Sequence, residues 1–449
     1  MKKGEITAVI IDRLDSDGIG MGVLDGRTIK VPGTCPGDTV RAVVTTIKRA
    51  TARARLQTIE TPGIGRIPPP CPHFAVCGGC RWQDIPYPEQ LSLKSGMLRD
   101  ALSRSGEGSV SRDVPVQPSP EIFHYRNKME FSFDQPPESG TLSLGLHEAG
   151  KFNRVFDITG CLLESPQSNR IVAEARRFAV EHGLTACGLK SHRGLLKYLV
   201  IREGKATGET MVNLVTSGEE FPVPERFASR LRETIPGIST ILWSVNKSTS
   251  GVATGGERRV LAGNGCIHDR IGSFGYEISP DSFFQTNTGQ AVQLYETIGE
   301  FAKLTGGERV LDLYCGTGTI GIFLAGLAKS VLGIEISEEA VRDAGKNAVL
   351  NGIGNIEFVA GKVESTIREG MGLFEVVVCD PPRAGIHPRA MDQLVRMRIP
   401  RMVYVSCNVA ALPNDLEVLR LAGYRVADIR AFDMSPHTPH IETVVLLEL

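Results

Sequence analysis

Two short segments near the C-terminal end of the sequence contain the residues best suited to covalent chemistry. Asp380 begins the segment DPPRAG after the apolar run FEVVVC, and Cys407 lies in SCN after the apolar run RMVYV. If both runs are strands of one parallel sheet, their carboxyl ends bring Asp380 and Cys407 to the same edge. Cys407 could act as a nucleophile if the site lowers the pKa of its thiol or supplies a base, and Asp380 is the nearby carboxylate expected to orient Cys407 and the ring. Taken alone, Cys407 would be read as a buried cysteine at a strand end.

A cysteine nucleophile suits the methylation of a uracil ring at carbon 5. This carbon reacts poorly until a nucleophile adds to carbon 6 and turns the ring into an enolate, and a thiolate can add and later leave. A base must then remove the proton from carbon 5, and Glu442 in HIETVV is the candidate. The two prolines after Asp380 are followed by Arg383 instead of an aromatic residue, which disfavours an exocyclic amine as the target.

A glycine-rich turn upstream predicts a nucleoside site. The apolar run RVLDLYC leads into GTGTIG, where Gly316 lets the backbone approach a ligand closely before a helix begins. Glu335 ends the next apolar run, 21 residues after Tyr314, and is suited to accept hydrogen bonds from both ribose hydroxyls. No basic partner for a pyrophosphate stands nearby, so S-adenosylmethionine fits better than NAD. Cys315, in the same turn, is predicted to be a packing residue.

A cluster of cysteines predicts shared metal ligation. Cys71, Cys77 and Cys80 lie together in CPHFAVCGGC, and a fourth ligand must come from a distance. Cys161, in the turn segment DITGCLLE, is best placed to supply it. A zinc site would usually offer two pairs of cysteines, which leaves zinc as the lesser alternative. Unpaired structural thiols are the other alternative.

The elements that must position these residues predict a multidomain protein. From Gly4 to Glu60, short β-rich segments separated by turns are typical of a small closed barrel, and the segment TPGIGRIPPP reads as a linker. Short strands and one helical stretch, SNRIVAEARRFAVEHG, predict a central α+β domain. Apolar strands then alternate with helical segments, as in a doubly wound α/β sheet. The predicted domains are 1–60, 71–270 and 271–449.

Composition and charge narrow the class of protein. The chain has 449 residues, 41% of them hydrophobic, which is enough for two or three globular domains. No apolar run approaches the ~20 residues of a membrane span, and acidic residues interrupt the first segment before a signal peptide is complete. We therefore expect a cytoplasmic protein with reduced cysteines and no membrane partner. The net charge of -1 does not by itself indicate a nucleic-acid binder.

The motifs LDLYCGTGT, DPPRAG, SCN and HTPHIETV, in this order and spacing, resemble those of the RNA uridine-5-methyltransferase family. The resemblance covers nearly the whole chain, and the N-terminal segment resembles a TRAM domain, a small RNA-binding barrel of OB-like type. It implies a Rossmann-like class I methyltransferase domain, with Cys407 as the nucleophile and Glu442 as the proton-abstracting base. It also implies S-adenosylmethionine contacts from Gln285, Tyr314, Glu335 and Asp380. Val409 and Lys362 depart from the family pattern.

The same resemblance extends to the cysteine cluster. Cys71, Cys77, Cys80 and Cys161 resemble the [4Fe-4S] ligands of the branch that carries both a cluster and a TRAM domain. That branch implies a structural cluster and 23S ribosomal RNA as the substrate, with the T-loop uridine of tRNA as the alternative. We expect a monomer without an obligate protein partner. A noncatalytic RNA-binding or ribosome-assembly factor is a further alternative, which the presence of the complete set of catalytic residues disfavours.

Attack on carbon 5 requires the target base to leave its stack, so single-stranded loops are the expected substrates. Residues 1–60 hold ten Lys and Arg against seven Asp and Glu, and the run KRATARAR is a candidate for phosphate contact. The segment HYRNKMEF is a second candidate. The predicted contact residues are Lys48, Arg49, Arg53, Arg55, His124, Arg126, Asn127 and Lys128. For both segments, a solvated strand face is the alternative.

Overall fold

The computed structural model describes residues 1–105, 113–136, 139–189, 191–249, 251–368 and 370–449. These residues form two compact units whose limits do not coincide with the predicted domains. The first unit contains Met1–Phe74, Cys80–Ser119 and Asp380–Leu449, and the second contains Ala75–Gly79 and Pro120–Cys379. The N-terminal barrel and the C-terminal segment therefore belong to the same unit.

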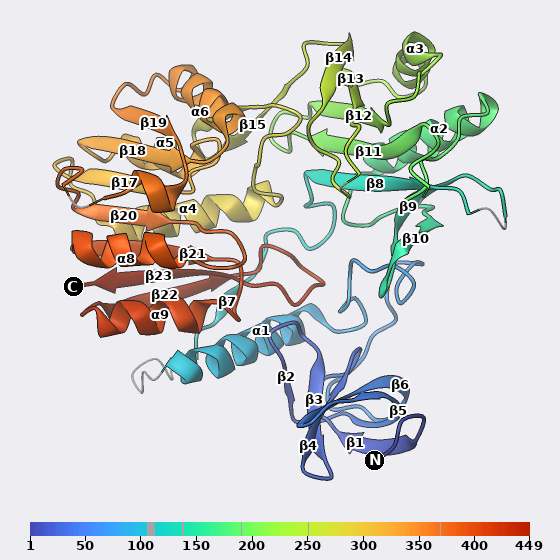
Figure 1. Cartoon of the computed structure of the whole chain (residues 1–449), viewed down its shortest axis with the longest axis horizontal. Helices are drawn as coiled ribbons and strands as arrows, with labels where there is room; N and C mark the ends of the chain where they lie inside the picture. Colours follow the sequence, from blue (N-terminus) through green and yellow to red (C-terminus); the bar gives the residue numbers. More distant parts are fainter. Residues whose placement is uncertain (106–112, 137–138, 190, 250, 369) are drawn as a thin grey trace. The chain divides into compact units, whose positions relative to one another are not determined.

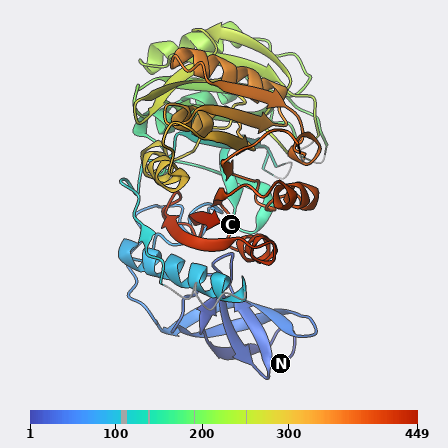
Figure 2. The ribbon, with the colours of Figure 1, turned by 90° about the vertical axis from the view of Figure 1, so that its left-hand side faces the viewer.

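The N-terminal strands of the first unit form the predicted barrel, which Figures 1 and 2 show at the blue end of the chain. The strand order is β1-β5-β6-β4-β3-β2. The strands are β1 (Ile6–Ile10), β2 (Arg13–Leu14), β3 (Gly20–Leu24), β4 (Arg27–Val31), β5 (Thr39–Ile47) and β6 (Thr51–Thr61). Alternate residues of β5 and β6, among them Val40, Ala42 and Ala54, fill the core. A Cβ at Gly22 of β3 would lie 2.2 Å from the carbonyl oxygen of Ile10 in β1, so glycine is required where these strands approach.

The remainder of the first unit packs helices against four neighbouring strands in the order β21-β23-β22-β7. Its helices are α1 (Tyr87–Leu102), the 3-10 turn η1 (Ser103–Ser105), α8 (Pro388–Met397) and α9 (Leu412–Leu421). Its strands are β7 (Val116–Gln117), β21 (Arg401–Ser406), β22 (Arg425–Phe432) and β23 (Glu442–Glu448). β23 is antiparallel to both β21 and β22, whereas β7 is parallel to β22. β7 and α1 thus join the C-terminal segment, although the sequence assigned them to the central domain.

The second unit contains a largely antiparallel sheet of order β10-β9-β8-β11-β12-β13-β14. The strands are β8 (Lys128–Asp134), β9 (Ser143–Glu148), β10 (Lys151–Asp157), β11 (Leu196–Glu203), β12 (Thr210–Thr216), β13 (Thr240–Val245) and β14 (Glu257–Ala262). The helices are α2 (Pro166–Glu181) and α3 (Pro224–Thr234). α2 is the predicted helix, and the Ser165 side chain caps it by accepting the N–H of Ser168 at 3.0 Å. This part of the chain therefore combines helices with a largely antiparallel sheet.

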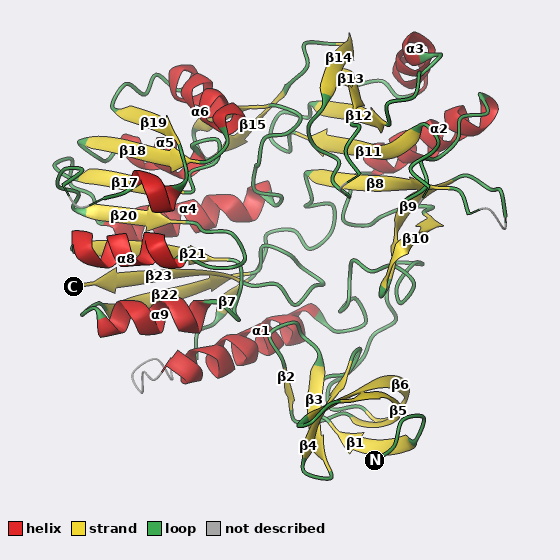
Figure 3. Ribbon diagram, in the orientation of Figure 1, coloured by secondary structure: helices red, strands yellow, loops and turns green. Residues whose placement is uncertain are grey.

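The second unit also contains four parallel strands in the order β19-β18-β17-β20, with the strand and helix alternation visible in Figure 3. The strands are β17 (Arg309–Leu313), β18 (Ser330–Glu335), β19 (Ile356–Ala360) and β20 (Val376–Cys379). The helices are α4 (Thr288–Ala302), α5 (Thr319–Ala325), α6 (Glu338–Leu350) and α7 (Val363–Thr366). A hairpin of β15 (Ile267–Ile271) and β16 (Phe274–Ile278) precedes them, so the boundary predicted between residues 270 and 271 lies inside a strand.

Among the described residues, no helix combines the length and the apolar character that a bilayer span requires.

Candidate active site

The end of β21 and the start of β23 meet at one edge of the sheet in the first unit. Ser406, the last residue of β21, pairs with Thr443 of β23 in antiparallel register. Cys407 follows Ser406 and Glu442 precedes Thr443, so continuing the register places Cys407 opposite Glu442. Cys407 is partly exposed, whereas Glu442 is 8% exposed. The predicted nucleophile is therefore accessible and lies beside the predicted base.

The SCN turn is joined to the DPPRAG loop by hydrogen bonds. The side-chain amide of Asn408 donates to the carbonyl oxygen of Arg383 at 2.7 Å, and its oxygen accepts the N–H of Ala410 at 2.9 Å. The backbone N–H of Asn408 donates to the hydroxyl of Ser406 at 3.3 Å. Asn408 thus fixes both the turn that carries Cys407 and the loop that begins with Asp380.

Asp415 of α9 anchors the other end of the DPPRAG loop. Its Oδ2 atom accepts the N–H of Ile386 at 2.9 Å and the hydroxyl of Tyr404 at 2.7 Å. Gly385 has a φ of 85°, and a Cβ there would lie 2.6 Å from the same carboxylate oxygen. Only glycine allows the loop to turn at this point and to pass so close to Asp415.

Burial and like charge control protonation at this edge. Burial raises the pKa of Glu442 well above its usual range, and Asp380 raises it further, whereas Arg383 lowers it. Burial likewise raises the pKa of Asp380. Two carboxyl groups so placed cannot both ionise readily, and each is a stronger base than an exposed carboxylate.

The thiol of Cys407 is not activated by a lowered pKa. Burial raises its pKa to about 11, Glu442 and Asp380 add to the increase, and Arg383 opposes it. The sequence left two ways to activate the thiol: a lowered pKa or a nearby base. The structure supplies the second, because the two carboxyl groups that make the thiol a weak acid are also the candidates to accept its proton.

The loop that leads to Glu442 is held by two polar residues of α1 that the sequence did not single out. Gln90 accepts the backbone N–H of His437 at 2.9 Å, and its side-chain amide donates to the carbonyl oxygen of Trp82 at 2.9 Å. Lys94 donates to Asp433 Oδ1 at 2.5 Å, and both side chains are fully buried. Gln90 and Lys94 are four residues apart and lie on the buried face of the helix. This spacing in the sequence could have indicated that both side chains point to the same side of α1.

The barrel touches the same loop. A Cβ at Gly18, in the turn before β3, would lie 2.4 Å from Cβ of Pro439 and 3.1 Å from the ring of Trp82. Arg81 donates a side-chain hydrogen bond to the carbonyl oxygen of Asp17 at 2.8 Å, and its backbone N–H donates to His437 at 2.9 Å. The barrel turn therefore packs directly against the segment that precedes Glu442.

In the second unit, the predicted cofactor residues gather at the carboxyl ends of β17 and β18. The carboxylate of Glu335 accepts the N–H of Gly316 at 3.1 Å and the N–H of Ser337 at 2.9 Å. Tyr314 has a φ of 62° and Gly316 a φ of 54°, both in the left-handed region. A Cβ at Gly316 would meet no atom within 4 Å, so the backbone borders open space beside Glu335. Cys315 is buried, as a packing residue should be.

Gln285 lies in a loop tied to its surroundings at several points. The hydroxyls of Ser279 and Ser282 both donate to Asp343 of α6 at 2.7 Å. The hydroxyl of Thr317, in the glycine-rich turn, donates to the carbonyl oxygen of Phe283 at 3.1 Å. These bonds join the Gln285 loop to the turn that contains Gly316, so the two predicted cofactor segments are neighbours.

Asn127 has a different role from the one predicted. It is 4% exposed, and its side-chain amide donates to the carbonyl oxygen of Gln285 at 2.7 Å and to the hydroxyl of Thr288 at 2.9 Å. The prediction of a phosphate contact is therefore wrong for Asn127, which positions the Gln285 loop instead. Lys128 is ion-paired with Glu130 at 2.6 Å, and burial lowers its pKa.

The basic side chains of the run KRATARAR lie on the solvent-exposed face of the barrel. Arg53 and Arg55 are exposed, whereas Ala52 and Ala54 between them are buried. A groove of about 410 Å³ beside this face is lined by Lys30, Thr46, Lys48, Thr51, Ala52 and Arg53. Cations and an open groove on one surface are the features that phosphate binding requires.

The four predicted cluster cysteines are not joined in disulfides. Cys71, Cys77 and Cys80 are partly buried, and Cys161 is buried. Gly79 donates its backbone N–H to the sulfur of Cys77 at 3.3 Å, the kind of bond that stabilises a cluster thiolate. The backbone N–H of Cys161 donates to Asn169 at 2.7 Å, which fixes the turn that carries this cysteine. Cysteine thiolates are the donors that iron-sulfur clusters take, so the residue type at these four positions suits the expected group.

Comparisons with known proteins bear on these sites. A family model described as tRNA (Uracil-5-)-methyltransferase matches residues 265–449, and a TRAM domain model matches residues 1–56. Two proteins named as uncharacterized RNA methyltransferases are similar over the whole chain: one from Halalkalibacterium halodurans is 36% identical over 98% of its length, and one from Chlorobaculum tepidum is 37% identical over 97%.

One solved structure is similar over the same extent. It is the tRNA (uracil-54, C5)-methyltransferase of Pyrococcus abyssi in complex with S-adenosyl-L-homocysteine. The identity is 33%, the TM-score is 0.78, and the match covers 98% of this chain and 100% of that one. The region matched by the methyltransferase model contains Gln285, Glu335 and Cys407, so the predicted catalytic and cofactor residues all fall within it.

Proposed function

We propose that the substrate of this chain is a uridine of 23S ribosomal RNA. The chain belongs to the tRNA (uracil-5-)-methyltransferase family and is an RNA methyltransferase with a TRAM domain. S-adenosylmethionine is the methyl donor, and carbon 5 of the uracil receives the methyl group. The observation that carries the chemistry is the meeting of Cys407, Glu442 and Asp380 at one edge of the first unit.

The reaction begins at the sulfur of Cys407. The thiol proton passes to the carboxylate of Asp380, and the sulfur forms a bond to carbon 6 of the uracil. The electron pair of the ring double bond moves to give an enolate with nucleophilic character at carbon 5. The raised pKa of Asp380 supports this step, because it makes the carboxylate a better base for a thiol that is itself a weak acid.

When bound, S-adenosylmethionine would supply the methyl group to carbon 5 and leave as a neutral thioether. The hydrogen at carbon 5 passes as a proton to Glu442, the carbon 6–sulfur bond breaks, and the double bond is restored. The thiolate of Cys407 regains its proton from Asp380, and Glu442 loses its proton to solvent. Its high pKa suits Glu442 to the abstraction of a proton bound to carbon.

The methyl donor is assigned to the second unit. Glu335 would accept the ribose hydroxyls, and Gln285 and Tyr314 would contact the remainder of the nucleoside. The open space beside Gly316 supports close approach of a ligand to the backbone. Asp380 is proposed to contact the donor as well as to serve Cys407.

A second RNA, tRNA, is also a candidate substrate. The Pyrococcus abyssi structure is that of an enzyme acting on uracil 54 of tRNA, and its similarity extends over 98% of this chain. The T-loop uridine of tRNA is therefore the second candidate. To distinguish the two, the purified chain is incubated with S-adenosylmethionine and with unmodified 23S rRNA or unmodified tRNA, and 5-methyluridine is mapped by mass spectrometry. Product in tRNA alone would overturn the ribosomal assignment.

The covalent step is tested with RNA that contains 5-fluorouridine, which has no proton at carbon 5 to lose. We expect the wild-type chain to become trapped on this RNA as a complex that survives denaturing electrophoresis, and Cys407→Ser to give neither trapping nor methylation. Glu442→Gln should accumulate the adduct on ordinary RNA, because the proton cannot be removed. Methylation by Cys407→Ser at the wild-type rate would overturn the proposed nucleophile.

The cluster is part of the same proposal. Cys71, Cys77, Cys80 and Cys161 hold a [4Fe-4S] cluster that stabilises the RNA-binding form and takes no part in redox turnover. Anaerobically purified chain should contain about four iron atoms and show the visible absorption of a thiolate-bound iron-sulfur cluster. Cys161→Ser should lose both signals, whereas the control Cys187→Ser, at a partly buried cysteine outside the set, should retain them. Bound zinc with no iron would overturn this assignment.

A further inference from the structure

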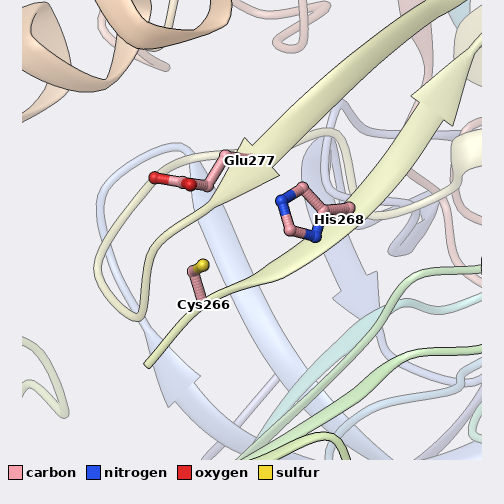
Figure 4. Close-up of side chains that lie close together, drawn as sticks. All are labelled: Cys266, His268 and Glu277. Carbon is pink, nitrogen blue, oxygen red and sulfur yellow. The ribbon is translucent and has the colours of Figure 1, made fainter. Parts of the chain in front are cut away.

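A mixed group of metal-ligand side chains lies on the β15–β16 hairpin, apart from the residues used above. Cys266, His268 and Glu277 each offer one ligand atom, and these atoms lie within 4.8 Å of one another. Figure 4 shows the three side chains around a common space. All three are partly exposed, so a metal ion could reach them from solvent.

The strand geometry explains why these side chains meet. His268 of β15 is paired directly with Glu277 of β16, so both side chains lie on the same face of the hairpin. Cys266 precedes His268 by two residues, and side chains two apart on an extended chain share a face. The hairpin backbone therefore presents a sulfur, an imidazole nitrogen and a carboxylate oxygen together, without help from any distant element.

A fourth side chain orients the imidazole. Glu209 Oε2 lies 3.2 Å from Nδ1 of His268 and also accepts the backbone N–H of His268 at 2.8 Å. A carboxylate on one ring nitrogen fixes the tautomer and leaves the other nitrogen free to bind a cation. This carboxylate–histidine pair is the usual outer support of a histidine ligand in metal sites.

The charge around the group also suits a cation. Glu277 and Glu209 contribute two carboxylates to the group. The positive charge of Lys346 of α6 offsets the negative charge of Glu277, since its Nζ lies 3.3 Å from the Glu277 carboxylate. The Lys346 side chain is 60% exposed, so it can turn into solvent when a cation binds. A thiolate from Cys266 would add a further negative charge, and the combined field favours a divalent ion.

We propose that the β15–β16 hairpin binds one zinc ion through Cys266, His268 and Glu277, with Glu209 holding the imidazole. Sulfur, nitrogen and oxygen ligands together match the preference of zinc and do not suit magnesium or calcium, which take oxygen ligands. Three protein ligands leave the fourth tetrahedral position to water.

The site adjoins the cofactor segment. The backbone N–H of Glu277 donates to Asn347 of α6 at 2.8 Å, and Ser279, two residues later, donates its hydroxyl to Asp343 of the same helix. A bound ion would brace the hairpin from which the Gln285 loop starts. The proposed site takes no part in the proposed reaction, so it stands whether or not that reaction is correct.

The test compares metal binding by the full-length chain and single variants. Zinc is measured by equilibrium dialysis and metal analysis. Iron is measured in the same samples to show whether the four cluster cysteines hold iron, so that zinc bound there is not counted for the hairpin. Wild type and the control Cys187→Ser should bind one zinc more than Cys266→Ser or His268→Gln. Cobalt(II) should give a thiolate charge-transfer band in wild type that Cys266→Ser lacks. Equal zinc content and equal cobalt spectra in wild type and Cys266→Ser would overturn the proposal.

A thermal measurement covers the case in which a cysteine variant fails to fold. Glu277→Gln keeps the size of the side chain and removes the carboxylate charge. Added zinc should raise the melting temperature of wild type and of Cys187→Ser and leave that of Glu277→Gln unchanged. A zinc-induced shift of equal size in Glu277→Gln, or no shift in wild type, would contradict the site.

Discussion

Lys94 of α1 and Asp433 form an ion pair in which both side chains are fully buried and Nζ lies 2.5 Å from Oδ1. Burial lowers the pKa of Lys94, and Asp433 opposes this by favouring the charged lysine. Asp433 also accepts the N–H of Ser435 at 3.1 Å, so the pair fixes the start of the loop that leads to Glu442. The connection joins a helix early in the sequence to the segment near its end that leads to Glu442, the proposed base.

Lys94→Met should destabilise the first unit by about 3–5 kcal/mol, because it leaves the Asp433 carboxylate buried without a cation beside it. The double change with Asp433→Leu should recover much of this loss. Urea unfolding is followed by the fluorescence of Trp82 in a Trp243→Phe background, since these are the 2 tryptophans of the chain. Arg99→Met is the control: its pair with Asp113 is exposed and should be worth under about 1 kcal/mol. Equal effects of the Lys94 and Arg99 changes would contradict the prediction.

The reactivity of Cys407 should depend steeply on pH. With a pKa of about 11, the thiol is protonated at neutral pH and ionises only as the pH rises. Alkylation by iodoacetamide should therefore accelerate about tenfold per pH unit from pH 7 to pH 10, whereas an ordinary exposed cysteine levels off near its pKa of ~8.5. Mass spectrometry of the peptide that contains Cys407 gives the rate.

Glu442→Gln provides the matched comparison for this measurement. Once Glu442 is ionised, its charge raises the pKa of Cys407, and the substitution removes that charge. Alkylation should therefore be faster than in wild type in the alkaline range, where Glu442 has lost its proton. A plateau in the wild-type rate below pH 9, or slower alkylation in Glu442→Gln, would show that the carboxylates do not act on the thiol in this way.

Asn127→Ala should weaken binding of S-adenosylhomocysteine about tenfold, since losing the hydrogen bonds that hold the Gln285 loop costs on the order of 1–2 kcal/mol. Isothermal titration calorimetry measures the affinity. The control is Asn153→Ala, at an exposed asparagine of β10 in the same unit. An unchanged affinity in Asn127→Ala would mean that this anchor does not shape the cofactor site.

Removing Arg53 and Arg55 together should weaken RNA binding and reduce its dependence on salt. Each lost phosphate contact should lower the slope of log affinity against log salt by about 1. Filter binding at several salt concentrations gives the slope. Arg41→Ala is the control on the same barrel, because the charge of Arg41 is offset by Glu60 at 2.6 Å. A double variant with the wild-type slope would place the RNA elsewhere.

The sequence predicted the parts of the site that follow strand ends. Glu335 ends β18, and Cys407 follows β21, as expected from apolar runs followed by polar residues. The role of α1 could not be predicted, because Lys94 finds its partner 339 residues later and a buried lysine interrupts the apolar pattern. Asn127 was misassigned for the same reason: its partner, Gln285, lies 158 residues away. Local pattern identifies strand ends, and it does not identify pairings over such separations.

The contact between Gly18 and Pro439 limits the distance along the RNA between a phosphate bound at the barrel and the reacting base. The barrel that carries Arg53 is packed through its turn onto the segment preceding Glu442, so the two cannot slide past each other within this unit. If a phosphate is held at the basic strand, the number of nucleotides that can separate it from the reacting base is fixed by the protein. Loops with one nucleotide inserted between these points would present the neighbouring base to Cys407.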